Sequence, residues 1–198
     1  MKTNSRGFTL IELLVVIAII AILSVVVILT LNPAELLRQA RDSNRISDLS
    51  TLKTAIGQYL ADVSSPTLGF TAAGTTYTVC GESNTTSTAV AHANCGFTLN
   101  IYTVSSSDSR AVDGSGWIPV DFTDISSGAP IGTLPVDPTN ANEMVYRYAA
   151  SSTLVYELNA IMESTKQTNS TTGAAATDGG TDASSTIYAA GTAPGLAL

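Results

Sequence analysis

The residue with the most evident chemistry is Glu12, because of the apolar run that follows it. From Leu13 to Leu31 the sequence contains no charged residue and only two polar ones, Ser24 and Thr30. A carboxylate costs roughly 2.5 to 3.5 kcal/mol at the centre of a membrane helix and less near its end, so it is expected to have a compensating partner. An ion pair with a positive group of the same or a neighbouring chain is one solution. The alternative is an interaction with the positive end of the helix dipole, with the side chain extended towards lipid headgroups.

The cysteines are the next candidates for chemistry. Cys80 and Cys95 are the only two, and His92 is the only histidine. In an oxidising compartment two cysteines pair by default, and a disulfide here closes a loop of about 15 residues, worth roughly 3 kcal/mol on chain-entropy arguments. Two cysteines and one histidine do not supply the four ligands of a structural zinc site. We therefore predict a Cys80–Cys95 disulfide, with His92 as a loop residue.

The other polar residues show no catalytic pattern. The sequence has no Ser-His-Asp, Cys-His, paired-carboxylate or phosphate-loop arrangement. Sixteen acidic and nine basic residues give a net charge of −7, which disfavours sequence-independent nucleic-acid binding because that needs a basic patch. The sequence predicts neither an enzyme nor a protein that binds nucleic acid directly.

The apolar run is long enough to span a membrane. About 19 residues in a helix measure about 28 Å, close to the roughly 30 Å hydrocarbon core of a bilayer. Lys2 and Arg6 precede the run, and the positive-inside rule therefore keeps the N-terminus in the cytoplasm. We predict a single-pass membrane protein whose chain after Asn32 is extracytoplasmic.

The residues at the start of this run resemble a known leader. From Gly7 to Glu12 the sequence reads Gly-Phe-Thr-Leu-Ile-Glu, and with the basic residues before it this string resembles the type III leader of type IV pilins and type II secretion pseudopilins. The resemblance implies that a membrane prepilin peptidase removes residues 1–7 by cutting between Gly7 and Phe8. It also implies that the new amine of Phe8 is methylated and that the apolar helix, residues 8–31, is retained.

This resemblance gives Glu12 a partner. An ion pair with the Phe8 amine is possible within one chain, since the two residues are four apart. In a water-free bundle of such helices, the Glu12 carboxylate of an incoming subunit can instead neutralise the Phe8 amine of its neighbour, and each charge then removes the desolvation cost of the other. The partners implied are further copies of the chain in a helical filament, an inner-membrane platform protein, an assembly ATPase and membrane lipid.

A second helix is expected over residues 32–63. Asn32, Pro33 and Glu35 have the types and spacing of a helix start, and Pro33 breaks the helix before it. In filaments of the family a stretch near such a proline can unwind, so Pro33 is a candidate hinge, with a simple interfacial kink as the equal alternative. Apolar residues then recur every three or four positions, which predicts a stripe that packs on a sheet. The stripe comprises Leu36, Leu37, Ala40, Ile46, Leu49, Leu52, Ile56, Leu60 and Val63.

The opposite face of this helix is charged. Arg38 with Asp42 and Arg45 with Asp48 are spaced for helix-surface pairs, each worth a few tenths of a kcal/mol. We interpret Arg38, Arg41 and Arg45 as a solvated face, with lipid headgroups or acidic patches of neighbouring subunits as alternative contacts.

Residues 64–163 are expected to form a β-rich head. Thr75–Cys80 and Phe97–Val104 have the β-branched and aromatic composition of strands. Residues 116–122 are a third candidate, which Pro119 demotes to an edge strand or an extended coil. Val145–Ala149 and Thr153–Ala160 alternate well enough for a hairpin.

The block from Leu134 to Asn140 and the hairpin after it resemble the C-terminal half of major pseudopilins. In those proteins a Pro-Asp-Pro turn feeds a β-hairpin that lies across the helix, and calcium binds near the end of the sheet through carboxylate and carbonyl oxygens. The nearest oxygen-bearing side chains here are those of Asp137, Asn140, Asn142 and Glu143. They are too few for the six to eight oxygens that calcium prefers, so a plain capped turn is the favoured interpretation and calcium the weaker alternative.

Residues 164–198 are rich in Thr, Ser, Gly, Ala and Asp, which predicts a low-complexity tail with little to bury. Ile187 and Tyr188 are candidates to dock back on the sheet. Together with the resemblance, these features predict an α+β pilin fold: a long N-terminal helix, half in the membrane and half amphipathic, packed on a small antiparallel β-sheet.

The favoured function is that of a structural filament subunit. It would be a pilin of a type IV pilus or a related filament, anchored in the membrane after leader cleavage and then polymerised through its N-terminal helix, with the head at the cell surface or in the periplasm. Two alternatives stay open: a pseudopilin of a type II secretion system, and a membrane-anchored extracytoplasmic binding protein that never polymerises. The C-terminal half is more similar to pseudopilins, whereas the disulfide and the extended tail are more similar to pilins.

Overall fold

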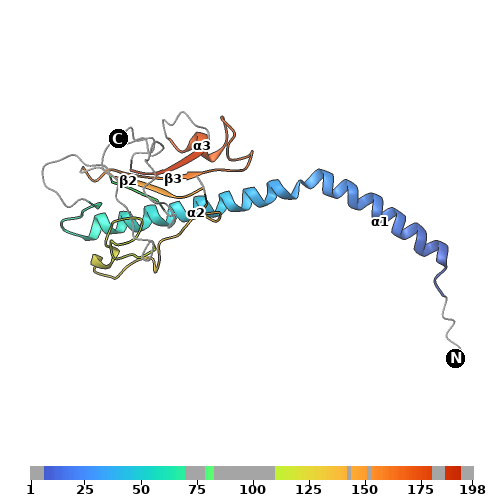
Figure 1. Ribbon diagram of the computed structural model, residues 1–198, viewed down its shortest axis with the longest axis horizontal. Helices are drawn as coiled ribbons and strands as arrows, with labels where there is room; N and C mark the ends of the chain where they lie inside the picture. Colours follow the sequence, from blue (N-terminus) through green and yellow to red (C-terminus); the bar gives the residue numbers. More distant parts are fainter. Residues whose placement is uncertain are drawn as a thin grey trace, which may run out of the picture. The chain divides into compact units, whose positions relative to one another are not determined.

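The computed structural model describes residues 7–69, 79–82, 110–141, 144–150, 153–179 and 186–192. The chain divides into two units, residues 1–38 and 39–198. The elements in chain order are α1 (Leu10–Leu31), α2 (Pro33–Asp62), β1 (Val79–Glu82), the 3-10 helix η1 (Phe122–Asp124), β2 (Arg147–Ala150), β3 (Tyr156–Ile161), α3 (Ala174–Thr177) and β4 (Ile187–Gly191) (Figure 1).

The first helix ends where the sequence predicts. α1 is followed by Asn32, whose φ of 38° lies in the left-handed region that asparagine tolerates better than most residues. The next helix begins at Pro33, whose fixed φ and missing N–H suit the first helical position. The carbonyl of Asn32 accepts hydrogen bonds from the amides of Glu35 and Leu36 at 3.0 and 3.3 Å. The predicted break between the two helices is confirmed.

α2 buries one face, but not the whole of the predicted stripe. Leu36 and Leu37 are 50% and 62% exposed, so the stripe is wrong for the first turns of the helix. The buried residues of this half are Asp42 and Arg45 instead, because positions 42, 45, 49, 52, 56 and 59 follow one another at steps of three or four and share one helix face. The second half of the stripe is confirmed, since Leu49, Leu52 and Ile56 are buried and Leu60 and Val63 are partly buried against the same core. Ala55 and Tyr59 are also buried, although the predicted stripe did not include them.

The predicted surface pairs on α2 are wrong for the same reason. Arg45 is fully buried rather than solvated. Arg38 pairs with Glu35 at 3.9 Å, and the Asp48 carboxylate accepts a hydrogen bond from the Tyr146 hydroxyl at 2.7 Å. Asp42 and Arg45 therefore face the core of the head, although the sequence pattern predicts that they face solvent, whereas Arg38 is exposed as predicted.

Four antiparallel strands form one sheet in the order β1-β2-β3-β4. Tyr148 of β2 lies opposite Leu158 of β3, which lies opposite Ala190 of β4. All three are buried in the same core as the apolar half of α2, so this face of the sheet packs on the helix (Figure 1). The predicted hairpin is confirmed as β2 and β3, and the α+β pilin fold is confirmed with it.

The fourth strand lies within the segment that composition predicts to be a low-complexity tail. β4 pairs with β3 from Ile187 to Gly191, which confirms the docking of Ile187 and Tyr188. The tail interpretation is wrong for these five residues, because the strand supplies the buried Ala189 and Ala190 to the sheet.

The other strand predictions have mixed outcomes. Residues 116–122 form no regular strand: residues 116–118 are bends, Asp121 makes an isolated bridge with Asp113, and Phe122 begins η1. The segment buries Trp117, Ile118 and Val120 completely. Of the predicted strand Thr75–Cys80 only the last two residues lie in β1, which continues to Glu82. Residues 75–78 and the predicted strand Phe97–Val104 lie outside the described residues.

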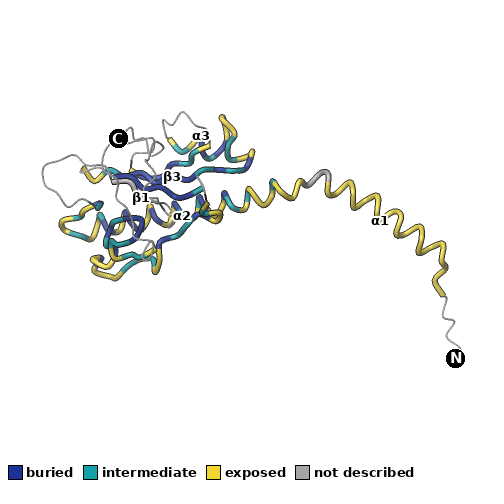
Figure 2. Tube along the Cα trace, viewed as in Figure 1, coloured by how far each residue is buried: buried dark blue, intermediate teal, exposed yellow. Residues whose placement is uncertain are grey.

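Aromatic side chains dominate the core of the head. Tyr59 of α2 meets Phe122 edge to face with ring centroids 6.2 Å apart, and Tyr148 lies 6.5 Å from Tyr156. Figure 2 shows the buried residues gathered in the strands and on α2, and α1 exposed along its described length. The head thus has a core of its own, whereas α1 has none.

Candidate functional site

The candidate site at the start of α1 is built by Thr9 and Glu12. Thr9 is the N-cap, and its hydroxyl oxygen accepts a hydrogen bond from the Glu12 amide at 3.3 Å. The Glu12 carboxylate reaches back and accepts from the Thr9 amide at 3.1 Å and from the Thr9 hydroxyl at 2.9 Å. This capping box satisfies two free donors of the first turn. It also holds the carboxylate at the beginning of the helix, beside Gly7 and Phe8, which precede the helix.

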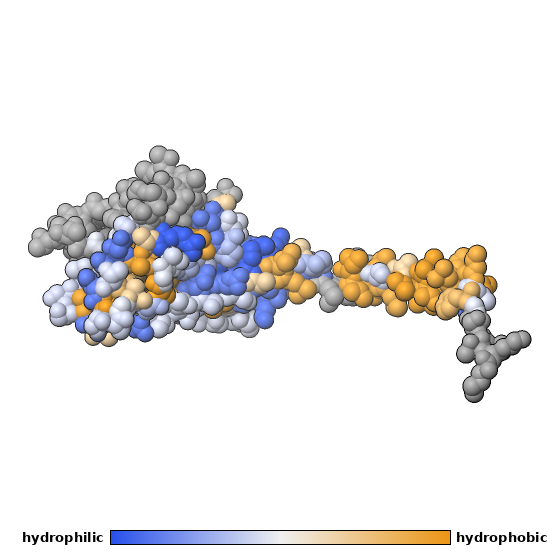
Figure 3. All heavy atoms as spheres, turned by 90° about the horizontal axis from the view of Figure 1, so that it is seen from below, coloured by the Kyte–Doolittle hydropathy of each residue, from blue (hydrophilic) through white to orange (hydrophobic). Residues whose placement is uncertain are grey.

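The rest of α1 is an apolar cylinder. The segment Leu10–Ile28 is long and apolar enough to cross a membrane, and none of its residues is buried within the chain. Figure 3 shows that most of the visible face of this helix is apolar. The hydroxyl of Ser24 donates to the carbonyl of Ile20 at 2.7 Å, so it adds no unsatisfied polar group to the surface. Such a helix needs lipid or other apolar helices around it.

The family comparison bears on the same residues. A profile described as the prokaryotic N-terminal methylation motif matches residues 2–28. The chain has a prepilin-type leader. No curated protein and no solved structure matches the chain. The leader is that of type IV pilin-like proteins and pseudopilins, a structural family rather than an enzymatic one, and it implies processing by a prepilin peptidase and anchoring through α1.

The structure brings together some of the predicted site residues and not others. Gly7, Phe8 and Glu12 of the prepilin-type leader lie within one short segment, while Pro33 stands at the start of α2. Their roles in cleavage, assembly and bending stay predictions. Cys80 lies in β1, but Cys95 is outside the described residues, so the disulfide also stays a prediction.

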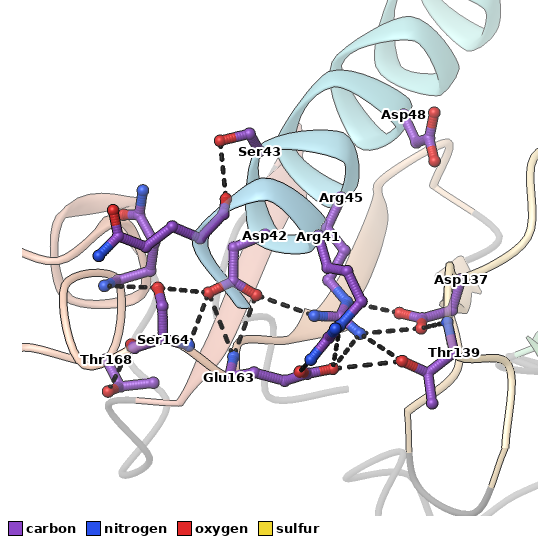
Figure 4. Close-up of polar contacts among 12 residues, drawn as sticks. Arg41, Asp42, Ser43, Arg45, Asp48, Asp137, Thr139, Glu163, Ser164 and Thr168 are labelled. Carbon is purple, nitrogen blue, oxygen red and sulfur yellow. Dashed lines mark hydrogen bonds and ion pairs between the residues drawn. The ribbon is translucent and has the colours of Figure 1, made fainter. Parts of the chain in front are cut away.

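The head contains a polar site that the sequence reasoning missed, centred on Arg45 (Figure 4). The Arg45 guanidinium donates to both carboxylate oxygens of Asp137, from Nε at 2.6 Å and from Nη2 at 2.9 Å. It also donates from Nη1 to Asp42 at 2.8 Å and from Nη2 to Glu163 at 2.7 Å. We call Arg41, Asp42, Arg45, Asp137 and Glu163 the Arg45 cluster. It joins α2 to the turn before β2 and to the segment after β3.

Asp42 fixes the chain as it leaves β3. Its carboxylate accepts from the Glu163 amide at 3.0 Å, from the Ser164 amide at 2.8 Å and from the Ser164 hydroxyl at 2.6 Å. Both Asp42 and Ser164 are fully buried. A carboxylate bonded to two consecutive backbone amides and to a guanidinium is well satisfied despite its burial.

Glu163 closes the cluster towards solvent. Arg41 donates to it from Nε at 3.0 Å and also from Nη2, and its side chain is 12% exposed. The hydrogen bonds from Arg41, aided by those from Arg45, lower the pKa of Glu163 to about 2 against the opposing effect of burial. Burial disfavours the charged form of Arg45, but its hydrogen bonds to Asp137 and Glu163 outweigh this and raise its pKa. Arg45 and Glu163 are therefore ionised at neutral pH.

The turn that carries Asp137 is held at two further points. Arg110 donates from Nε to the Leu134 carbonyl at 2.8 Å, and the Trp117 indole donates to the Pro135 carbonyl at 3.0 Å. Asp137 itself accepts from the amide of Thr139 at 2.8 Å. The favoured interpretation of this turn as a capped turn agrees with these contacts.

The same contacts bear on the weak calcium candidates. The carboxylate oxygens of Asp137 are engaged by Arg45 and by backbone amides, so Asp137 does not fit as a calcium ligand. Within the described part of the chain, no three acidic, histidine or cysteine residues are grouped to hold a metal. Asn140 lies beside Asp137 in the turn, whereas Asn142 and Glu143 lie outside the described residues.

The sequence did carry one signal for the Arg45 cluster. Asp42 and Arg45 are in phase with Leu49, Leu52 and Ile56 on the helix, so a strict reading of the period places them on the buried face. The partners of Arg45 could not be foreseen in this way, because Asp137 and Glu163 lie far along the chain, at 92 and 118 residues from it.

Proposed function

We propose that this protein is a structural subunit of a type IV pilus or a related filament. It is anchored by α1 after removal of residues 1–7 and is then polymerised through the same helix. The observation that supports this most is the prepilin-type leader joined to a helix whose apolar residues are exposed on all sides. An exposed apolar surface of this size is a place for lipid before assembly and for other copies of α1 after it.

Glu12 is the residue proposed to set the contact between subunits. Cleavage after Gly7 creates a positive amine on Phe8, close to the carboxylate that the capping box holds at the helix start. In an apolar bundle the Glu12 carboxylate of one subunit neutralises the Phe8 amine of the next, because neither charge is tolerated alone there. The proposed partners are prepilin peptidase, an inner-membrane platform protein and an assembly ATPase. The head faces the extracytoplasmic side and acts structurally rather than as an enzyme.

The test compares Glu12→Gln with a matched control in native cells. Glu35→Gln removes the same charge from the first turn of the other long helix, where the Glu35 carboxylate lies 3.9 Å from the Arg38 guanidinium. We expect the Glu12 variant to stay in the membrane without forming filaments, and the Glu35 variant to assemble normally. Normal filaments from the Glu12 variant would contradict the proposal.

N-terminal sequencing and mass measurement of sheared surface material give an independent check. The proposal expects filaments whose subunits begin at methylated Phe8 and retain residues 13–31. A soluble fragment that begins beyond Leu31, or an uncut form confined to the membrane, would support an anchored binding protein instead. Processed filaments that appear only in the periplasm would support a secretion pseudopilin.

A further inference from the structure

The buried face of α2 changes its chemistry part-way along the helix. From Leu49 to Tyr59 it is apolar, while Asp42 and Arg45, one to two turns nearer the N-terminus, are equally buried and charged. A buried ionic cluster is a poor source of stability, since well-packed apolar residues often do as well or better. The cluster therefore calls for another explanation.

The apolar half of α2 defines only in part where the helix sits along the sheet. Leu49, Leu52 and Ile56 have nearly equal volumes, and an exchange of one for another usually costs less than about 1.5 kcal/mol. Ala55 and Tyr59 are buried on the same face and differ in size, so a slip of one turn, about 5.4 Å, would also bring side chains of other volumes into the core. Packing therefore discriminates between neighbouring registers, and the charged residues add to it.

The charged half discriminates strongly. The two-point contact of Arg45 with Asp137, at 2.6 and 2.9 Å, depends on one alignment of the guanidinium plane with the carboxylate. Asp42 accepts from the consecutive amides of Glu163 and Ser164. After a slip of four residues, about one turn, Arg41 would take the place of Arg45, but Arg38 would take the place of Asp42, and the amides of Glu163 and Ser164 would then face a guanidinium instead of a carboxylate. After a slip in the opposite direction, Ile46 and Leu49 would stand in these two places and would leave Asp137 and the two amides without their partners.

We propose that the Arg45 cluster is a register lock that fixes the position of α2 along the sheet. The lock is a property of the single chain and does not depend on the filament. Its benefit does rest on the proposed function: α2 runs without a break from Pro33 to Asp62, so the register decides at which point of the helix the head is attached. Subunits whose heads are attached one helical turn apart along α2 could not pack regularly in one filament.

The single tryptophan of the chain offers a direct readout. The Trp117 indole N–H donates to the carbonyl of Pro135, two residues before Asp137. Its indole N–H resonance in a ¹H–¹⁵N correlation spectrum therefore reports on the turn that Arg45 contacts. The experiment uses the full chain in detergent micelles. The reference is Tyr146→Phe, which removes the second polar contact of the turn region with α2, the hydrogen bond to Asp48.

The test variant adds Asp42→Asn, Arg45→Met and Asp137→Asn to this reference. Both asparagines keep a carbonyl oxygen for the backbone amides, so mainly the charges and the guanidinium are lost. We expect one indole resonance for the reference. For the test variant we expect two or more indole resonances, or one that is strongly broadened. Circular dichroism should show the same helix content in the test variant and in the reference.

Two results would overturn the register lock. One is a single sharp indole resonance at the reference position in the test variant. The other is the same number of indole resonances in the test variant and in a control, Leu52→Ala in the Tyr146→Phe background. This control removes fully buried side-chain volume and leaves the Arg45 cluster intact. If the test variant does not fold, Asp137→Asn alone in the reference is judged by the same criteria. Because the micelle experiment uses single chains, its result is independent of whether the protein forms filaments.

Discussion

Replacing Arg45 with methionine should be one of the most damaging single changes in the head. The substitution leaves the carboxylates of Asp42 and Asp137 buried without their guanidinium partner. Removal of one member of a buried ionic group costs roughly 3 to 5 kcal/mol, because the remaining charge is uncompensated. In a protein of this size each kcal/mol lowers the melting temperature by about 2 to 4 °C. We therefore expect a fall of about 6 to 20 °C.

The matched control is Arg38→Met on the same helix. Arg38 is 51% exposed and lies 3.9 Å from Glu35, and surface pairs of this kind contribute at most about 1 kcal/mol. Thermal unfolding in micelles, followed by circular dichroism and by Trp117 fluorescence, measures both variants. Equal melting temperatures for the two variants would refute the reasoning, since the buried contacts of Arg45 would then contribute no more to stability than the exposed pair of Arg38.

A compensated variant separates charge from hydrogen bonding. When Asp42→Asn and Asp137→Asn accompany Arg45→Met, no unpaired carboxylate remains in these positions. The triple variant should be more stable than Arg45→Met alone, as expected when buried charges are removed together. A triple variant less stable than the single one would show that the loss comes from hydrogen bonds rather than from uncompensated charge.

Three further outcomes are expected. The hydrogen bond from Arg41 lowers the pKa of Glu163 to about 2, from an ordinary 4.5, so the stability due to its ionised form is complete above about pH 4.5 and is lost as the pH falls towards 2; Glu163→Gln should flatten the melting temperature in that window, and an unchanged slope would contradict this. Gly116→Ala should destabilise the head, because a Cβ there would lie 2.1 Å from the Ala111 carbonyl oxygen, whereas Gly132→Ala meets nothing within 4 Å and should be neutral; comparison of their melting temperatures decides. Non-reducing peptide mapping should find Cys80 joined to Cys95, and free thiols at both positions would refute the predicted disulfide.

The sequence predicts local features of this chain well because their causes are local. The break at Asn32 and Pro33 follows from a fixed φ and a missing donor, and the structure has it at that place. The capping box of Thr9 and Glu12 also lies within one turn, but the predicted contacts of Glu12, with the Phe8 amine of the same or a neighbouring chain or with the helix dipole, do not include Thr9.

Features that depend on distant residues were harder to predict. Arg45 looks like a surface residue because charged side chains usually are, and only its partners at positions 137 and 163 make its burial tolerable. The strand β4 was not predicted, because the Thr, Ser, Gly and Ala composition around it is typical of a low-complexity segment. Its small residues are suited to a place where the backbone of β3 approaches closely: a Cβ on Gly191 would lie 2.2 Å from the Tyr156 carbonyl oxygen.

The Arg45 cluster also answers a problem that the prepilin-type leader creates. A chain that carries an apolar helix exposed on all sides offers its own head a competing apolar surface, and an apolar stripe continued along α2 would favour a shift of the head towards it. Asp42 and Arg45 end that stripe with charges that find partners in one alignment only. A shift of one turn towards Pro33 would put Arg38 and Arg41 in place of Asp42 and Arg45, and the amides of Glu163 and Ser164 would lose the carboxylate that they contact. The charges that interrupt the apolar pattern thereby separate the apolar face of α2 that packs in the core of the head from the exposed apolar surface of α1.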